Sequence, residues 1–237
     1  MEKITDITGV IFDYGGTIDS RGVHWSEVLW QGFVSQNVPI TKEQFRDCYV
    51  HAERELARVR HILPNDNFHD LLVKKVRIEL DYLVNNDLLP AASDALCQAI
   101  ALYCYNAARE CVEEARPVLE ALSQRFPMML VSNFYGNVDS VLRDFDLRRY
   151  FKGVIESAVV GVRKPNPTLF RLGVDALEMD ARNILVVGDS LRKDIEPAES
   201  LGCKVLWIKG KGWTPDEDAQ THPCTITSIT QVTHLVL

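Results

Sequence analysis

The sequence contains no apolar run that approaches the ~18 residues needed for a membrane-spanning helix. It also lacks an excess of positive charge, because 26 lysines and arginines face 33 aspartates and glutamates, for a formal net charge of −7. Proteins that bind nucleic acid or anionic membranes carry basic patches on their surface. These two absences argue against a membrane or nucleic-acid partner.

The six cysteines include no Cys-x-x-Cys pair, which argues against zinc and thioredoxin-type sites. Cys97, Cys104 and Cys111 recur every seven residues, and this spacing predicts one side of a helix. Free cysteine is among the most buried residue types, so we expect small core residues there. The segment Met1–Ile4 lacks the charged and apolar regions of a signal peptide. Unpaired cysteines without an export signal predict a cytoplasmic protein.

The most informative stretch runs from Gly9 to Asp19, with the sequence GVIFDYGGTID. The apolar run Val10–Phe12 is typical of a strand buried on both faces. Asp13 follows at once, at the position where open α/β sheets bind their ligands. Gly15 and Gly16 have no Cβ, so backbone N–H groups can approach an anion closely. The stretch predicts a ligand site at the end of a first parallel strand.

From about residue 25 to residue 111 the sequence shows helical stripes and no convincing strand. Leu72, Val76, Leu80 and Leu83 form one such stripe, and Thr41–Gln44 has the form of a capping box. Roughly ninety residues are too many for one crossover connection, so we expect a helical domain inserted after the first strand. The predicted division is a core of residues 1–18 and 112–237 with an all-helical cap at 19–111.

Strands and helices alternate after residue 116. Apolar runs at 128–131, 153–155, 184–187 and 205–208 predict strands, with helices between them. Pro117 suits a first helical position, and the tail from Trp213 is expected to be irregular, with a weak strand near 225–226. This alternation predicts an α/β fold, with a doubly wound parallel sheet and right-handed crossovers.

Three predicted strands end in polar residues that can converge at one edge of the sheet. Asp13 and Asp189 offer the hard oxygen ligands that Mg²⁺ prefers, with Asp194 within reach on the next turn. Together they predict a magnesium site.

The other polar residues suit a phosphate. Ser132 can donate to a phosphate oxygen, and the Asn133 N–H can add to it. Lys164 supplies the positive charge that offsets repulsion between an anionic nucleophile and a phosphoryl group.

In these motifs the chain resembles the haloacid dehalogenase superfamily, in the subgroup with a helical cap inserted after the first motif. The matching segments are Asp13–Thr17, Ser132–Asn133, Lys164–Pro165, Gly188–Ser190 and Asp194. The resemblance spans almost the full length and implies a Rossmann-like core with an inserted cap. It also implies Mg²⁺-dependent phosphoryl transfer, as a phosphatase or phosphotransferase, through an aspartyl-phosphate on Asp13.

The same resemblance assigns roles to the motif residues. The implied catalytic residues are Asp13 and Lys164. Phosphate binding falls to Ser132, Asn133, Gly16 and Thr17. The implied metal ligands are Asp13, the carbonyl of Gly15, Asp189 and Asp194.

The sequence departs from the family pattern at Gly15. Phosphatases of this family carry a second aspartate there, two residues after the nucleophile, as general acid and then base. A positioned acid or base contributes on the order of 10²–10⁴ in rate, or about 3–5 kcal/mol of barrier. Asp19 and His24 lie nearby in the sequence and are candidates to replace it.

Four functions stay open because of this departure. The first is an enzyme for good leaving groups, such as acyl or aryl phosphates. The second resembles phosphonoacetaldehyde hydrolase, which needs a cap lysine. Lys74 and Lys75 are the candidates, and both are expected to be solvated. The third, a dehalogenase, needs no metal, and the retained Asp189 and Asp194 argue against it. The fourth is a non-catalytic regulator that binds a phosphorylated metabolite.

The cap predicts a small soluble phosphorylated substrate rather than a phosphoprotein. Position and charge suggest specificity contacts from Arg21, His24, Arg58 and Arg60. The oligomeric state, monomer or homodimer, is left open by the sequence.

Overall fold

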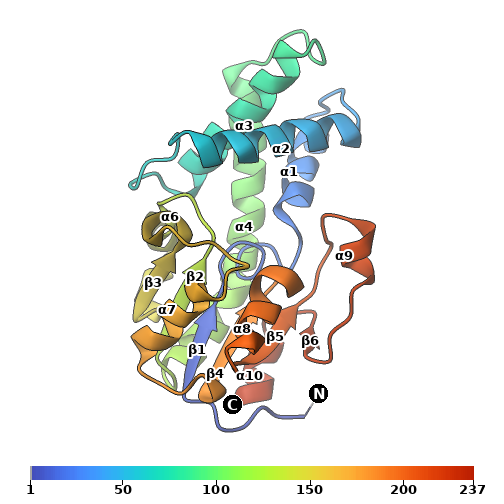
Figure 1. Ribbon diagram of the computed structural model, residues 1–237. Helices are drawn as coiled ribbons and strands as arrows, with labels where there is room; N and C mark the ends of the chain where they lie inside the picture. The colour runs from blue at the N-terminus through green and yellow to red at the C-terminus, as the bar shows by residue number, and fades with distance from the viewer. Residues whose placement is uncertain (1) are drawn as a thin grey trace.

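The computed structural model describes residues 2–237 (Figure 1). Its centre is a six-stranded sheet in the order β3-β2-β1-β4-β5-β6, in which every pair is parallel. The strands are β1 (Gly9–Phe12), β2 (Met128–Ser132), β3 (Gly153–Glu156), β4 (Ile184–Gly188), β5 (Lys204–Ile208) and β6 (Thr225–Ile226). The prediction of a Rossmann-like, doubly wound α/β core is confirmed.

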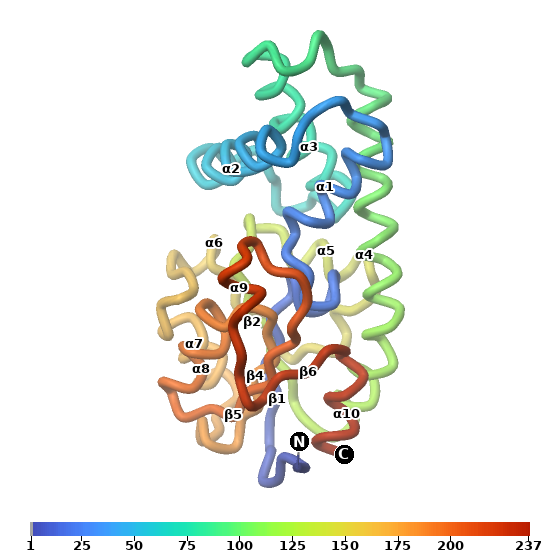
Figure 2. The backbone as a smooth tube through the Cα atoms, turned by 90° about the vertical axis from the view of Figure 1, so that its right-hand side faces the viewer, coloured from blue at the N-terminus to red at the C-terminus, as the bar shows by residue number. Residues whose placement is uncertain are grey.

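Helices cover both faces of the sheet (Figure 2). One face packs against α7 (Thr168–Leu177) and α8 (Glu196–Ser200), and the other packs against α5 (Val138–Asp144), α10 (Gln231–Val236) and the second half of α4. Val10 and Phe12 of β1 point into one layer, whereas Ile11 points into the other. Successive strand side chains alternate between faces, so a continuous apolar run serves a strand buried on both sides.

The remaining short elements connect these layers. They are η1 (Arg148–Tyr150), α6 (Ser157–Val160), η2 (Ala181–Asn183) and η3 (Leu191–Ile195). The last of these is a π-helical segment that follows β4 directly and carries Asp194.

Four helices form the inserted cap, which lies above the core in Figure 1. They are α1 (Trp25–Ser35), α2 (Lys42–Arg58), α3 (Phe68–Asn85) and the first half of α4 (Asp94–Ser123). The predicted capping box at Thr41–Gln44 starts α2, and a second box at Asn67–Asp70 starts α3. Cys97, Cys104 and Cys111 are buried in α4, as expected of small core residues.

Helix α4 is a single helix of 30 residues with Pro117 inside it. The prediction that Pro117 begins a new helix is wrong. Proline removes one hydrogen bond from a helix interior, but buried side chains on both sides, from Val112 to Leu122, hold the chain helical. The predicted domain boundary at residues 111/112 falls within this helix. No helix in the described part of the chain, α4 included, has the apolar length that would let it cross a membrane.

The tail is more regular than expected. It contains α9 (Pro215–Ala219) and α10 beside the predicted strand β6. Helix α9 buries no residue, so it has no apolar stripe for sequence analysis to detect. Its start depends on the Thr214 side chain, which accepts from the N–H of Glu217.

Glu79 on α3 is buried in the cap, where its carboxyl group lacks a hydrogen-bond partner in the described part of the chain. Its exposed fraction is 0%, and within residues 2–237 neither of its carboxylate oxygens has a hydrogen-bond donor. Burial raises the pKa of Glu79 to about 8, with Lys75 opposing the rise and Glu53 adding to it. The folded protein therefore holds this carboxyl protonated at neutral pH.

We expect Glu79 to make stability fall as pH rises. Between its unfolded pKa of 4.5 and its folded pKa of about 8, the folded state binds a proton that the unfolded state has released. The expected fall is at most about 1.4 kcal/mol per pH unit. Glu79→Leu removes this contribution, so its free energy of unfolding in urea should exceed the wild-type value by an amount that grows with pH. A difference that is constant with pH would contradict the assignment.

Candidate active site

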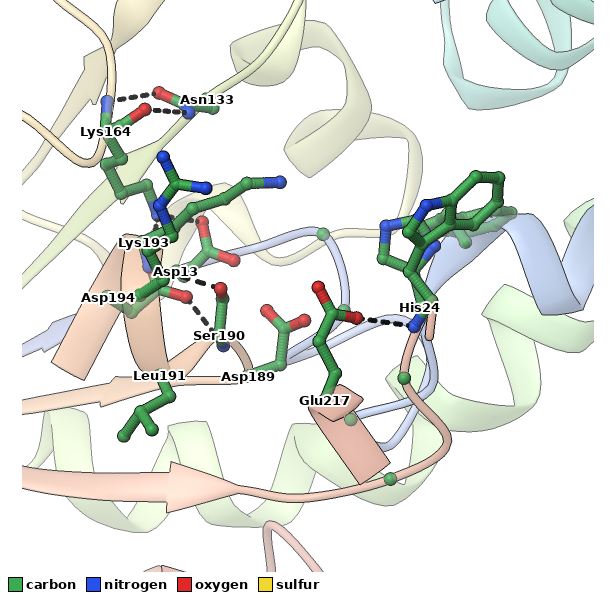
Figure 3. Close-up of a pocket in the computed structure, with 18 of the residues that line it drawn as sticks. Asp13, His24, Asn133, Lys164, Asp189, Ser190, Leu191, Lys193, Asp194 and Glu217 are labelled. Carbon is green, nitrogen blue, oxygen red and sulfur yellow. Dashed lines mark hydrogen bonds and ion pairs between the residues drawn. The ribbon is translucent and has the colours of Figure 1, made fainter. Parts of the chain in front are cut away.

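The polar strand ends converge at the carboxyl edge of the sheet, beneath the cap. Asp13 follows β1, Ser132 ends β2, and Asp189 follows β4. Strand β1 lies between β2 and β4, so the strand order reverses beside it, which is where doubly wound sheets bind ligands. Figure 3 shows Asp13, Lys164 and Asp194 gathered on one side of this space, with His24 and Glu217 across from them.

Asp13 is held by three side chains that sequence analysis had selected. Lys164 Nζ lies 2.6 Å and Ser132 Oγ 2.9 Å from Asp13 Oδ1. Thr17 Oγ1 lies 3.3 Å from the other oxygen, Oδ2, and 3.2 Å from Asp189 Oδ1. Asp13 is only 4% exposed. Its carboxylate is thus fixed in orientation, with two strong donors beside one oxygen.

Hydrogen bonds hold Lys164 in place at both its backbone and its ammonium group. The Asn133 side chain accepts from the Lys164 N–H at 2.9 Å and donates to the Lys164 carbonyl at 3.1 Å. The ammonium also donates to Asp194 Oδ1 at 2.5 Å. Burial alone would lower the pKa of Lys164, but the carboxylates of Asp13 and Asp194 outweigh it and raise that pKa. Lys164 is therefore a fixed positive charge at the site.

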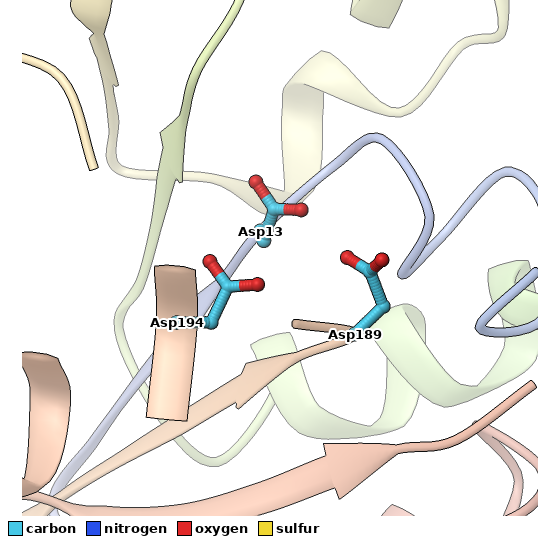
Figure 4. A group of neighbouring side chains, drawn as sticks. All are labelled: Asp13, Asp189 and Asp194. Atoms are coloured by element: carbon cyan, nitrogen blue, oxygen red, sulfur yellow. The ribbon is translucent and has the colours of Figure 1, made fainter. Parts of the chain in front are cut away.

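Three carboxylates face one another here, from Asp13, Asp189 and Asp194 (Figure 4). One oxygen of each lies within 4.8 Å of the others. Burial, and then the charges of Asp194 and Asp13, raise the pKa of Asp189, and burial likewise raises that of Asp194. Lys164 offsets only one of the three negative charges. A set of hard oxygen donors with surplus negative charge fits a divalent cation such as Mg²⁺.

The two glycines after Asp13 differ in what their positions require. At Gly16 φ is +97°, and an added Cβ would lie 2.3 Å from the carboxyl carbon of Asp189, so only glycine fits. At Gly15 the backbone lies outside the left-handed region, and an added Cβ would meet nothing closer than the Trp25 ring at 3.9 Å. The backbone therefore does not force the absence of a side chain at residue 15.

Asp19 stabilises the loop of residues 13–19 after β1, which we call the motif loop. Its Oδ1 accepts from the Gly16 N–H at 2.7 Å, and the Trp25 indole N–H lies 3.1 Å from both of its oxygens. Burial raises the pKa of Asp19 to about 7, although these hydrogen bonds oppose the rise. Asp19 lines neither of the two cavities described below. It orients Gly16 and Trp25.

His24 does face the site, but it is uncharged at neutral pH. Burial, and then the charges of Lys193 and Lys75, lower the pKa of His24 to about 4. Its Nδ1 lies 2.8 Å from Ser26 Oγ and caps α1. A neutral imidazole bound in this way is a poor source of a proton.

Two connected cavities open between the core and the cap. The larger, of about 670 Å³, contains Asp13, Lys164, Asp189 and Asp194 in its wall. The smaller, of about 250 Å³, shares Gly15, Asn133 and Lys164 with it and extends into the cap. The motif residues thus form the floor of a space that the cap covers.

Of the four expected specificity residues, only His24 lines a cavity. Arg21 pairs with Glu114, and Arg58 pairs with Glu55 near the surface. The basic side chains that do line the cavities were missed by sequence analysis: Arg54, Arg163, Arg192, Lys193 and Lys209.

The expectation that Lys75 is solvated is wrong. It is 4% exposed and forms an ion pair with Glu53 in the wall of the smaller cavity. Lys74 lies nearer the surface and pairs with Asp66 at 2.5 Å. The aromatic lining around Lys75 was also missed, because single aromatic residues on helices resemble ordinary core residues.

The tail contributes to the larger cavity through Trp213, which reaches the cap from the core. The Arg46 guanidinium lies 4.7 Å above the Trp213 ring and donates to its carbonyl at 2.5 Å. The Trp213 ring also packs 5.2 Å from that of Tyr49. This contact joins the tail of the core to α2 of the cap.

Comparison with known proteins agrees with this geometry. The family model for haloacid dehalogenase-like hydrolases matches residues 7–202. A glyceraldehyde 3-phosphate phosphatase from Pyrococcus abyssi is 34% identical over 91 residues, which are 38% of each chain. Haloacetate dehalogenase H-2 from a Moraxella species is 28% identical over 125 residues, covering 52% of this chain and 55% of that one. These matches span only part of the relatives' length.

Among solved structures, the HAD-hydrolase YfnB from Bacillus subtilis, bound to magnesium, shares the fold. It superimposes with a TM-score of 0.57 at 20% identity and covers 97% of this chain and 98% of its own.

Proposed function

The chain belongs to the haloacid dehalogenase-like hydrolases, and within this family we propose that it is a Mg²⁺-dependent phosphatase or phosphotransferase for a small phosphorylated metabolite. The observation that carries the proposal is the setting of Asp13. It is a buried carboxylate with Lys164 and Ser132 on one oxygen, beside two further carboxylates. The glyceraldehyde 3-phosphate phosphatase among its relatives acts on a small phosphate ester, as its name states.

In the proposed reaction a carboxylate oxygen of Asp13 attacks the phosphorus atom. The bond to the leaving oxygen breaks, and the leaving group departs with the electron pair. Lys164 and Ser132 then serve as donors to the phosphoryl oxygens, where negative charge accumulates. Water, or an acceptor alcohol, next attacks phosphorus and breaks the bond to Asp13, which returns as a carboxylate, while the proton of the attacking group passes to the phosphate product or to solvent.

The residues that would hold Mg²⁺ are Asp13, Asp189, Asp194 and the carbonyl of Gly15. When bound, the ion supplies positive charge that lowers the repulsion between Asp13 and the incoming phosphate. Asp194 also binds Lys164 at 2.5 Å, so it keeps the ammonium beside Asp13 as well.

Gly15 has no side chain to protonate the leaving group, and neither of the two expected replacements, Asp19 and His24, is suited to that role. Asp19 faces the Gly16 and Trp25 N–H groups, and His24 is neutral. We therefore propose a preference for esters that depart as stable anions, such as acyl or aryl phosphates. The intermediate on Asp13 is expected to hydrolyse slowly, because the same missing group would activate the water.

The ion pair between the buried Lys75 and Glu53 argues against the alternative that resembles phosphonoacetaldehyde hydrolase. Although burial alone lowers the pKa of Lys75, the charge of Glu53 outweighs it and raises that pKa well above its usual value. A Schiff base requires a neutral amine, which this pairing disfavours.

Beryllium fluoride tests the proposal, because it mimics a phosphoryl group on an ionised aspartate. With Mg²⁺, at 100 times its Kd, it should stabilise the protein by about 2.7 kcal/mol, or roughly 5–11 °C in Tm for a chain of this size. The Tm of Asp13→Asn should be the same with and without beryllium fluoride. A regulator selective for one metabolite would ignore the mimic, and equal shifts in both proteins would contradict the role of Asp13.

A further inference from the structure

The smaller cavity is lined by aromatic rings on both sides. Trp25, Tyr49 and Phe68 come from three cap helices, and Phe134 and Tyr135 follow β2 in the core. We call this space the aromatic cavity. Its floor contains Gly15, Asn133 and Lys164, so it opens directly above the phosphoryl site. Asp13 lines the larger cavity, which shares these three residues with the aromatic cavity, so a leaving group that extends from Asp13 toward the cap would enter it.

From this geometry we propose that the substrate is an aryl phosphate, whose aromatic ring occupies the aromatic cavity. The inference rests on the proposed phosphoryl-transfer function and names its substrate class. An apolar cavity of about 150 Å³ holds benzene, so the 250 Å³ here holds one ring with its substituents. Rings at this position would meet aromatic edges and faces from both the cap and the core.

The roof of the aromatic cavity is polar. Lys75 pairs with Glu53 there and lies 4.5 Å above the Tyr49 ring. The Tyr135 hydroxyl donates to Glu53 at 2.9 Å and lies 3.5 Å from the Lys75 ammonium. Lys75 is buried, whereas the Glu53 side chain is 36% exposed, so this pair faces a cavity rather than packed core. It provides donors and an acceptor for a polar substituent on the ring, opposite the phosphate.

The missing acid at Gly15 supports the same substrate class independently. A phenol ionises near pH 10, as tyrosine does, well below an aliphatic alcohol. An aryl oxide therefore departs as an anion without a proton donor. The aromatic lining and the glycine at residue 15 thus select the same kind of leaving group.

Binding of phosphonates tests this inference without turnover. Benzylphosphonate carries a ring at the position of an aryl ester, and ethylphosphonate does not; neither can lose its carbon group by P–O cleavage. By calorimetry with Mg²⁺, benzylphosphonate is expected to bind at least tenfold more tightly. Trp25→Leu and Tyr49→Leu should each reduce this preference. Tyr49→Leu leaves the Trp25–Asp19 contact of the motif loop intact.

Trp30→Leu is the matched control, because Trp30 lies on the same helix as Trp25, packs against Phe45 and lines neither cavity. It should retain the wild-type preference. Equal affinities of wild type for the two phosphonates, with a normal response to beryllium fluoride, would overturn the aryl assignment alone. No response to beryllium fluoride would instead overturn the proposed function, and the inference with it.

Discussion

Asp13→Asn is expected to abolish turnover of acetyl phosphate, lowering kcat by at least about 10³-fold. The variant keeps the shape of the side chain and its neighbours, Ser132 and Lys164, but loses the nucleophilic charge. Loss of a covalent nucleophile costs on the order of 10⁶ in a well-studied protease, so a 10³-fold loss is a cautious threshold.

The measurement is a steady-state phosphate-release assay with Mg²⁺ on acetyl phosphate and on a simple alkyl phosphate. Wild type should hydrolyse the acyl phosphate far faster, because its leaving carboxylate needs no proton. Asp175→Asn, at an exposed position on α7, is the matched control and should behave as wild type. Retention of wild-type turnover by Asp13→Asn would refute the assigned nucleophile.

Gly15→Asp is expected to increase turnover of the alkyl phosphate by about 10²–10⁴-fold, the range that a positioned acid contributes. The structure accommodates the side chain, since the nearest atoms to an added Cβ belong to Trp25 at 3.9 Å and the backbone lies outside the left-handed region. Both cavities are lined by residue 15, so the new carboxyl would reach the leaving group. Acyl phosphate turnover should rise less, because its leaving group needs little protonation and only hydrolysis of the intermediate on Asp13 gains from the new carboxyl.

Gly15→Asn controls for size and hydrogen bonding without a titratable proton, and it should leave alkyl phosphate turnover unchanged. An equal gain in Gly15→Asn would mean that positioning rather than proton transfer was missing. A folded Gly15→Asp protein without any gain would show that the acid is supplied by another residue.

The core and the floor of the site were predictable from sequence because both follow from strand ends. Asp13, Ser132 and Asp189 each terminate an apolar run, and parallel topology brings such ends to one edge. Lys164 follows no strand, and its place beside Asp13 was expected from the family resemblance rather than from periodicity. The geometry brings all four together.

The cavity in the cap was not predicted, although one signal was present. Lys75 and Glu79 fall at helical spacing within the apolar stripe of Leu72, Val76 and Leu80, so they share its buried face. Lys74 lies on the other side. The expectation that both Lys74 and Lys75 are solvated did not take this helical spacing into account. The error at Pro117 had a different cause, since proline at a helix start and proline inside a helix held by packing look alike in sequence.

The course of α4 has a mechanical consequence. The chain passes between cap and core twice, through residues 20–24 and through this one helix, which is about 45 Å long. Arg21 binds Glu114 at 2.6 Å, so the two connections lie side by side, at the level where Pro117 leaves the carbonyl of Glu113 without its helical donor. A change in the angle between cap and core would therefore bend α4 most easily at this turn, where the helix lacks one hydrogen bond.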